Sequence, residues 1–192
     1  EIWSNTGAYL RTIVVTSELT DDHDPTVAAL DNGNIAVAWV RTDHGSGDVD
    51  VMYAVYRPDG LPVVEPTLAG GAKHASFAPS IAATDEGFAI AYEFHPSNAA
   101  IWLNRFTAAG VSIEDALVAS AFAPGLAALG TAPSLSRGAD GNLMVVYTDE
   151  DGSVQAANVL KGGHLFDASN ALDFPSTGTG GVGTAFGVGQ VA

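Results

Sequence analysis

Carboxylates gather at a few places along this 192-residue chain, where they could bind a cation or act as acids and bases. The densest group is Asp21-Asp22-His23-Asp24, directly before Pro25. Carboxylates are hard oxygen ligands of the kind that Ca²⁺ binds, and crowding them raises the cost of leaving them unneutralised. Asp22 and Asp24 are therefore candidate calcium ligands. A solvated acidic loop is the alternative interpretation.

A second acidic group surrounds the bend Gly45-Ser46-Gly47, which could fold carboxylates and backbone carbonyls round one cation. Its carboxylates are Asp43, Asp48 and Asp50, and the nearly equivalent carboxylates later in the chain are Asp149 and Asp151. Neither group has the full spacing of an EF-hand loop. We expect Ca²⁺ as the cofactor of these loops, and again a solvated loop is the alternative.

Acid–base catalysis is a further interpretation of one acidic group. His23-Asp24-Pro25 is similar to the His-Asp-Pro element of five-bladed arabinanase- and xylosidase-type glycosidases, which implies Asp24 as general base. A glycosidase also needs a carboxylic acid across the scissile bond, and Glu93 is the best candidate. However, Pro25 is already explained by a repeat, because Ala78-Pro79 and Ala132-Pro133 stand at the same position. We therefore favour a non-catalytic role, with a glycosidase-like hydrolase as the alternative.

Aromatic side chains could bind a neutral ligand. Trp39, Tyr92 and Tyr147 recur at one repeat position and are expected to be core residues. Trp3 and Trp102 lie on other predicted strands, and an exposed indole there could stack on a sugar ring. Trp3 and Trp102 are thus the candidate ligand-binding residues.

A repeated motif must position these residues. Pro25, Pro79 and Pro133 stand 54 residues apart, and a glycine follows each of them by eight residues. A degenerate fourth copy opens at Pro175. After each glycine the apolar residues alternate up to an aromatic residue, which is typical of strands. A period of about 40 to 55 residues with several short strands per copy is typical of β-propeller blades.

Each full copy divides into four predicted strands. In the first copy they are 26–30, 35–41, 49–57 and 61–68. Asn32-Gly33 and Asp59-Gly60 supply turns between them, because these pairs tolerate a positive φ. Residues 116–129 could form a short helical turn between two copies. The predicted fold class is therefore all-β, a β-propeller with four-stranded antiparallel blades.

The predicted domain is a single propeller over residues 1–192. Its blades are residues 25–78, 79–132 and 133–174, with a split blade made of residues 175–192 and 1–24. Closing one blade with both termini would give four blades and remove exposed strand edges. The alternative is a segment of about three and a half blades from a longer propeller. Because the chain begins at Glu1, we interpret it as a processed or excised segment.

The amino-acid composition narrows the classes of molecule that this chain could bind. Asp and Glu number 22 against 7 Lys and Arg, which gives a formal net charge of −15. Such a surface repels phosphate backbones, so nucleic acid is excluded as a partner. No apolar stretch reaches the length of a membrane span, so membrane insertion is not expected. The chain has no cysteine, which excludes disulfides and thiol catalysis.

The repeat also resembles a group of known proteins. The pattern from Pro25 to Trp39, the loop His44-Gly45-Ser46-Gly47-Asp48 and the strand with its turn at 53–60 resemble repeats of very large secreted bacterial proteins of the calcium-binding RTX and adhesin type. This resemblance implies a secreted or cell-surface module for adhesion, binding a glycan or a protein. A purely structural module that self-associates is the remaining alternative.

Overall fold

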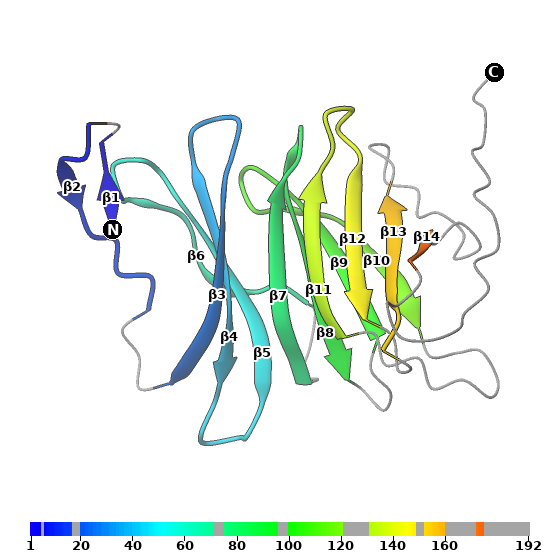
Figure 1. The fold of residues 1–192 in the computed structure, drawn as a ribbon. Coiled ribbons are helices and arrows are strands. Elements are labelled where there is room, and N and C mark those ends of the chain that lie inside the picture. Colours follow the sequence, from blue (N-terminus) through cyan, green and yellow to red (C-terminus); the bar gives the residue numbers. More distant parts are fainter. Residues whose placement is uncertain are drawn as a thin grey trace.

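The computed structural model describes residues 1–4, 6–16, 20–70, 75–95, 100–120, 131–148, 152–159 and 172–174. The regular secondary structure within these residues consists of β-strands, so the described part of the chain is all-β as predicted. Its strands form three antiparallel four-stranded sheets and one two-stranded hairpin. In each four-stranded sheet the spatial order of the strands follows the sequence (Figure 1).

Sheet 1 comprises β3 (Asp21–Ala29), β4 (Ile35–Thr42), β5 (Val49–Tyr56) and β6 (Pro62–Leu68). Sheet 2 comprises β7 (Ala75–Ala83), β8 (Gly87–His95), β9 (Ala100–Thr107) and β10 (Ser112–Ser120). Sheet 3 comprises β11 (Thr131–Arg137), β12 (Leu143–Thr148), β13 (Val154–Val159) and β14 (Leu172–Phe174). The hairpin pairs β1 (Ile2–Trp3) with β2 (Tyr9–Arg11).

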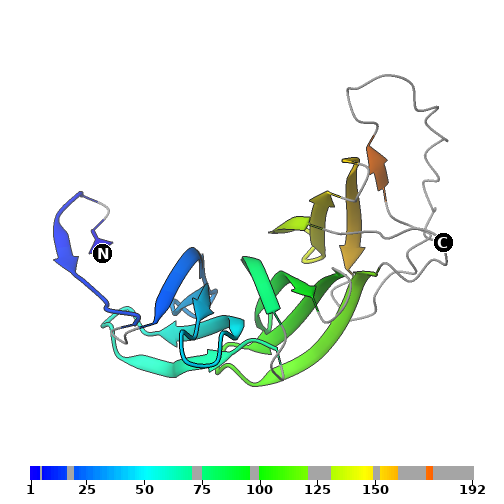
Figure 2. The same ribbon diagram turned by 90° about the horizontal axis from the view of Figure 1, so that it is seen from below.

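The three sheets stand side by side along a curve, with the hairpin beyond sheet 1 (Figure 2). One four-stranded sheet for each full repeat was predicted, and this is confirmed. Among the described residues no sheet closes on itself, and the propeller stays a prediction. The half of the split blade assigned to residues 175–192 lies outside the described residues.

The first strand of each sheet begins earlier than predicted. We expected it to start after the repeat proline, at residue 26, but β3 starts at Asp21 and passes through Pro25. Proline fits there because a β-bulge interrupts the pairing: His23 pairs with Val40 and Thr26 pairs with Ala38, so one extra residue lies on β3. The same bulge recurs before Ser80 and Ser134 in the other sheets.

The residue before each repeat proline has a left-handed backbone. Asp24, Ala78 and Ala132 have φ values of 50°, 48° and 49°. Opposite the three bulges stand the repeat aromatics, Trp39, Tyr92 and Tyr147. Trp39 and Tyr92 are buried and Tyr147 packs against the core, so the prediction of core aromatics is confirmed.

The core lies between the sheets and follows one packing rule. Each sheet has a large-residue face, and sheets 1 and 2 also have an alanine face. The alanine face is named for its first two strands, which carry Ala28, Ala36 and Ala38 in sheet 1 and Ala82, Ala89 and Ala91 in sheet 2. The third strand of the same face carries larger residues, Val51, Tyr53 and Val55 in sheet 1 and Ile101 and Leu103 in sheet 2. Against these alanine faces pack the large-residue faces of the next sheet, with Ile81, Phe88, Ile90 and Tyr92 from sheet 2 and Leu135, Leu143, Val145 and Val159 from sheet 3. Small residues let a neighbouring sheet approach closely and fill its gaps with large side chains.

Two smaller predictions differ from the structure. Residues 116–120 belong to β10 rather than to a helical turn, and the rest of that segment lies outside the described residues. In the N-terminal part of the predicted split blade, residues 9–16 form a strand only at Tyr9–Arg11. Residues 12–16 instead lie across sheet 1 without strand pairing, and Ile13 and Val15 pack against the face of that sheet.

The left-handed alanines generate a test of the bulge. Ala78→Gly should raise the free energy of unfolding by about 0.5–1 kcal/mol, because glycine adopts this φ without the strain of a Cβ atom. Ala82→Gly, on the same strand but in the core, should lower it by at least about 0.5 kcal/mol. Urea denaturation of both variants measures the change in the free energy of unfolding, which should be positive for Ala78→Gly and negative for Ala82→Gly. Equal destabilisation by both would contradict the role assigned to the bulge.

Candidate functional site

The N-terminal strap, residues 12–16, lies on the large-residue face of sheet 1. Ile13 and Val15 pack against the buried cluster of this face, which contains Trp39, Met52, Ala54 and Tyr56. Val14, between them, points outward and is 69% exposed. The hydroxyl of Tyr56 donates a hydrogen bond of 3.3 Å to the carbonyl of Val15. The strap therefore takes the place on sheet 1 that a preceding sheet would take.

One carboxylate fastens the strap to sheet 1. Oδ2 of Asp22 accepts hydrogen bonds from the hydroxyls of Thr16 at 2.6 Å and Thr20 at 3.0 Å. Oδ1 accepts bonds from Nε1 of Trp39 at 2.9 Å and from Nε of Arg41 at 3.0 Å. The Asp22 side chain is only 12% exposed. Its oxygens thus already serve donors of the protein, while its predicted role as a calcium ligand stays a prediction.

Burial of Asp22 opposes ionisation, but the hydrogen bonds from Thr16, Arg41, Thr20 and Trp39 outweigh it and lower its pKa to about 2. This lowering of the Asp22 pKa from its ordinary value of 3.8 adds about 2 kcal/mol to the free energy of unfolding at neutral pH. This contribution is complete above pH 3.8 and is lost as the pH falls through about 2.

A cleft of about 390 Å³ opens between the strap and sheet 1. It is lined by residues 12–16, Arg41, Tyr56, Gly60, Pro62, Glu65 and Pro66. Burial and the nearby Glu65 carboxylate raise the pKa of the Tyr56 hydroxyl, so this group stays protonated and can donate. The cleft thus combines an aromatic ring with hydroxyl, guanidinium and carboxylate groups.

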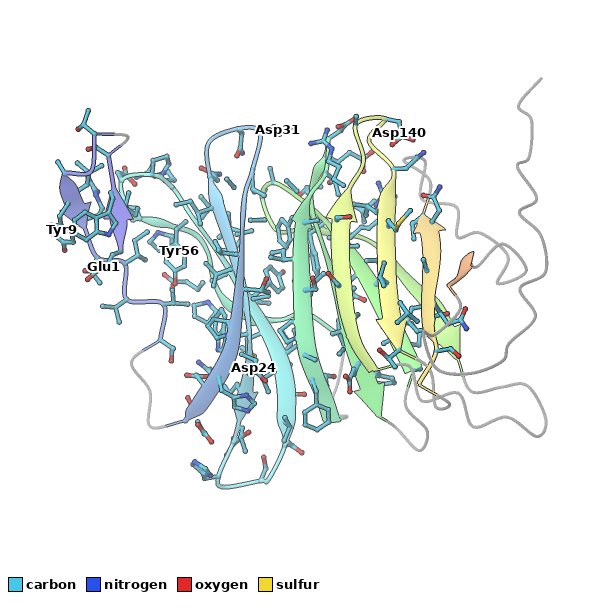
Figure 3. The ribbon with its side chains drawn as sticks, in the orientation of Figure 1. Glu1, Tyr9, Asp24, Asp31, Tyr56 and Asp140 are labelled. Carbon is cyan, nitrogen blue, oxygen red and sulfur yellow. The ribbon has the colours of Figure 1, made fainter. Side chains whose placement is uncertain are left out.

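An exposed aromatic pair continues this cleft. Trp3 and Tyr9, from the two strands of the hairpin, are 55% and 52% exposed. Their ring centroids are 5.4 Å apart in an edge-on arrangement. The Tyr9 hydroxyl forms a 3.0 Å hydrogen bond with the Thr12 hydroxyl, and Thr12 lines the cleft. Tyr9 and Tyr56 lie on the same side of the molecule (Figure 3). Trp3 was predicted from sequence, but Tyr9 and the cleft were not.

Trp102, the other predicted ligand-binding residue, has a different environment. It is half-buried against the core between sheets 1 and 2. Its ring stands edge-on to Phe94, with centroids 5.6 Å apart. Of the two tryptophans, only Trp3 offers most of its ring to solvent.

The second acidic group forms the loop between β4 and β5. Oδ1 of Asp43 accepts hydrogen bonds from the backbone N–H groups of Gly45 and Ser46, which lower its pKa. Asp48 and Asp50 are half-buried at the other side of this loop. Within the described ranges, no three His, Asp or Glu side chains are grouped closely enough to hold a metal ion. Asp149 and Asp151 lie outside the described residues.

The predicted catalytic carboxylates are held by separate sheets. Asp24, on β3, is 66% exposed, and its carboxylate contacts Nδ1 of His23 at 3.1 Å. Glu93, on β8, accepts a hydrogen bond from the backbone N–H of Ala132, the left-handed residue of sheet 3. Neither residue lines the cleft under the strap. The glycosidase interpretation stays a prediction.

An arginine that the sequence analysis did not single out joins three turns. Arg137, at the end of β11, bonds to Asp31 at 3.2 Å and also to Asp85. These aspartates lie in the first turns of sheets 1 and 2, each six residues after the repeat proline. The shared spacing of the two aspartates from the repeat prolines was the one signal in the sequence that could have pointed to this contact. The turns lie at the end of the sheets opposite Asp24, as the labels of Asp31 and Asp140 show in Figure 3.

Comparison of the chain with models of protein families and with curated proteins gave no match. Within the residues that the structure describes, no helix is long and apolar enough to cross a membrane.

The Asp22 network predicts a defined pH dependence. Asp22→Asn should lower the free energy of unfolding by about 2 kcal/mol near pH 7, because the amide replaces a charged acceptor of four hydrogen bonds. The difference from the parent should shrink below pH 3.8 and vanish towards pH 2. Urea denaturation between pH 2 and 7 measures this.

Asp21→Asn is the matched control, since Asp21 is exposed on the same strand. It should change stability by less than about 0.5 kcal/mol at every pH. A constant difference between Asp22→Asn and the parent down to pH 2 would contradict the ionic role of Asp22.

Proposed function

We propose that this chain is a non-catalytic binding module of a secreted or cell-surface protein, built as a β-propeller and directed at a glycan. The observation that carries the proposal is the exposed Trp3–Tyr9 pair beside the cleft under the strap. A sugar presents an apolar C–H face and a rim of hydroxyls. Exposed aromatic rings bind the former, while carboxylate, guanidinium and hydroxyl groups bind the latter.

The propeller is supported by the way the sheets stack. All three have the same strand order, and each described interface places a large-residue face on the alanine face before it. Repeated four-stranded sheets that contact only their neighbours along a curve are the units of such folds. A rigid stack of this kind can present the hairpin and cleft without any moving part.

A glycan-array screen, run in parallel in millimolar calcium and in EDTA, tests the proposed function. We expect binding to one class of sugar, and Trp3→Ala should weaken that binding about tenfold or more by removing the stacking surface. Val111→Ala, at a valine that is 63% exposed on sheet 2, is the matched control and should leave the affinity unchanged. Silence in both buffers would overturn the glycan proposal in favour of a protein ligand.

Calcium is the cofactor we propose for the acidic loop between β4 and β5. Asp48 and Asp50 stand half-buried beside a backbone turn, and their carboxylate oxygens are ligands of the kind that Ca²⁺ binds. Calcium at about 100 times its dissociation constant should stabilise the fold by about 2.7 kcal/mol and raise the melting temperature by several degrees. Asp48→Asn should abolish that shift, whereas Asp140→Asn should retain it. An unchanged melting temperature in calcium would remove the cation from the proposal.

A further inference from the structure

Arg11 differs from the other arginines of this chain in its partners. The structure describes all five arginines, and four of them form ion pairs with carboxylates. These pairs join Arg41 with Asp22, Arg57 with Asp59, Arg105 with Glu86, and Arg137 with Asp31 and Asp85. Arg11 instead donates from Nη1 to the backbone carbonyl of Asp59, and among the described residues its guanidinium forms no ion pair. In a chain with 22 acidic side chains, one guanidinium charge is thus left without a carboxylate partner.

This charge lies at one end of the cleft under the strap. The Arg11 side chain lies against Gly60, where an added Cβ atom would be 3.5 Å from Cδ and 3.9 Å from Nη1 of Arg11. Gly60 lines the cleft, and so does Thr12, the residue after Arg11. Thr12 in turn holds the hydroxyl of Tyr9. Arg11 and the exposed Trp3–Tyr9 pair therefore flank the same end of the cleft.

The carboxylate nearest in the chain to this contact is already used. Asp59 binds Nε and Nη2 of Arg57 through its two carboxylate oxygens, at 3.1 and 2.9 Å. One of these oxygens also accepts the backbone N–H of Leu61. Asp59 therefore holds Arg11 by its neutral carbonyl, while its negative charge is paired with Arg57. The charge of Arg11 remains available to a ligand.

The other end of the cleft has the opposite character. Glu65 lines the cleft five residues after Gly60, a separation on the order of 15 Å along an extended strand. Its exposed carboxylate can accept sugar hydroxyls but would repel an anion. Arg41, the other charged residue that lines the cleft, is paired with Asp22. An anionic group of a ligand therefore fits at the Arg11 end and is disfavoured at the Glu65 end.

We propose that the glycan bound at this site carries a carboxylate, as in a uronic or sialic acid, and that Arg11 binds this carboxylate while Trp3 and Tyr9 bind the sugar ring. This inference rests on the proposed function. A guanidinium presents a planar fork of N–H donors that matches the two oxygens of a carboxylate. At physiological salt, exposed carboxylates of the protein farther away than about 8 Å are largely screened. The net charge of −15 still disfavours a densely charged polyanion, so one acidic group per binding site is expected.

Matched pairs of glycans test the inference. The probes end in glucuronic, galacturonic or sialic acid, and each is compared with the same glycan after reduction of its carboxyl group to an alcohol. At least one acid should bind the full chain about tenfold or more tightly than its reduced partner, because reduction removes a charge-assisted contact. If glycans bind but no acid exceeds its reduced partner, the inference is overturned while the proposed function stands. If no glycan binds, the proposed function fails and the inference fails with it.

Arg11→Gln isolates the contribution of the guanidinium. It should remove the preference for the acid and leave the affinity for the reduced glycan unchanged. Arg11→Lys keeps the charge without the planar fork and should retain only part of the preference. Arg137→Gln makes the same change of net charge at a residue that does not line the cleft, and this matched control should keep the full preference.

Two results with these variants would overturn the proposal. A full preference for the acid in Arg11→Gln would show that the carboxylate binds elsewhere. A loss of affinity for both members of the glycan pair would show that Arg11 only holds the hairpin in place.

Discussion

The packing of a large-residue face on an alanine face is the constraint on which the rest of the structure depends. It spaces the sheets, and it buries the repeat aromatic of sheet 2 against sheet 1. A sheet with an apolar face must bury that face against another element, so each sheet needs its neighbour. At sheet 1 the same need is met in part by the strap. A segment without regular pairing there does the work of a sheet face.

The strap also explains why the candidate site lies where it does. Fastening an irregular segment over a sheet leaves room beneath it, and the backbone groups that strands would pair remain available for side chains and ligands. Asp22 anchors one end of the strap through Thr16, and Tyr9 reaches Thr12 at the other. The cleft is thus a consequence of filling the place of a sheet with a single chain segment.

Sequence periodicity predicted the sheets well and the contacts between distant residues poorly. The spacing of prolines and glycines located β4, β5 and β6 to within a residue or two, because alternation and turn residues are local signals. The bulges were missed, since proline alone suggested the start of a strand, whereas a left-handed Asp24 or Ala78 lets the strand continue through it. Asp22 was recognised as charged and important, but its partners Trp39 and Arg41 come together only through β-pairing. Nothing in the sequence pointed to Tyr9, because its relevance depends on the exposure of its ring to solvent.

Arg137 changes how the stack should behave as a whole. In a row of repeats whose contacts stop at the nearest neighbour, each unit can open or close with little effect beyond the next one. Arg137 contacts turns in both preceding sheets, so the last described sheet is connected to the first as well as to the second. Opening of sheet 3 would therefore break a contact of sheet 1 as well as of sheet 2, at the modest free-energy cost of ion pairs near a surface.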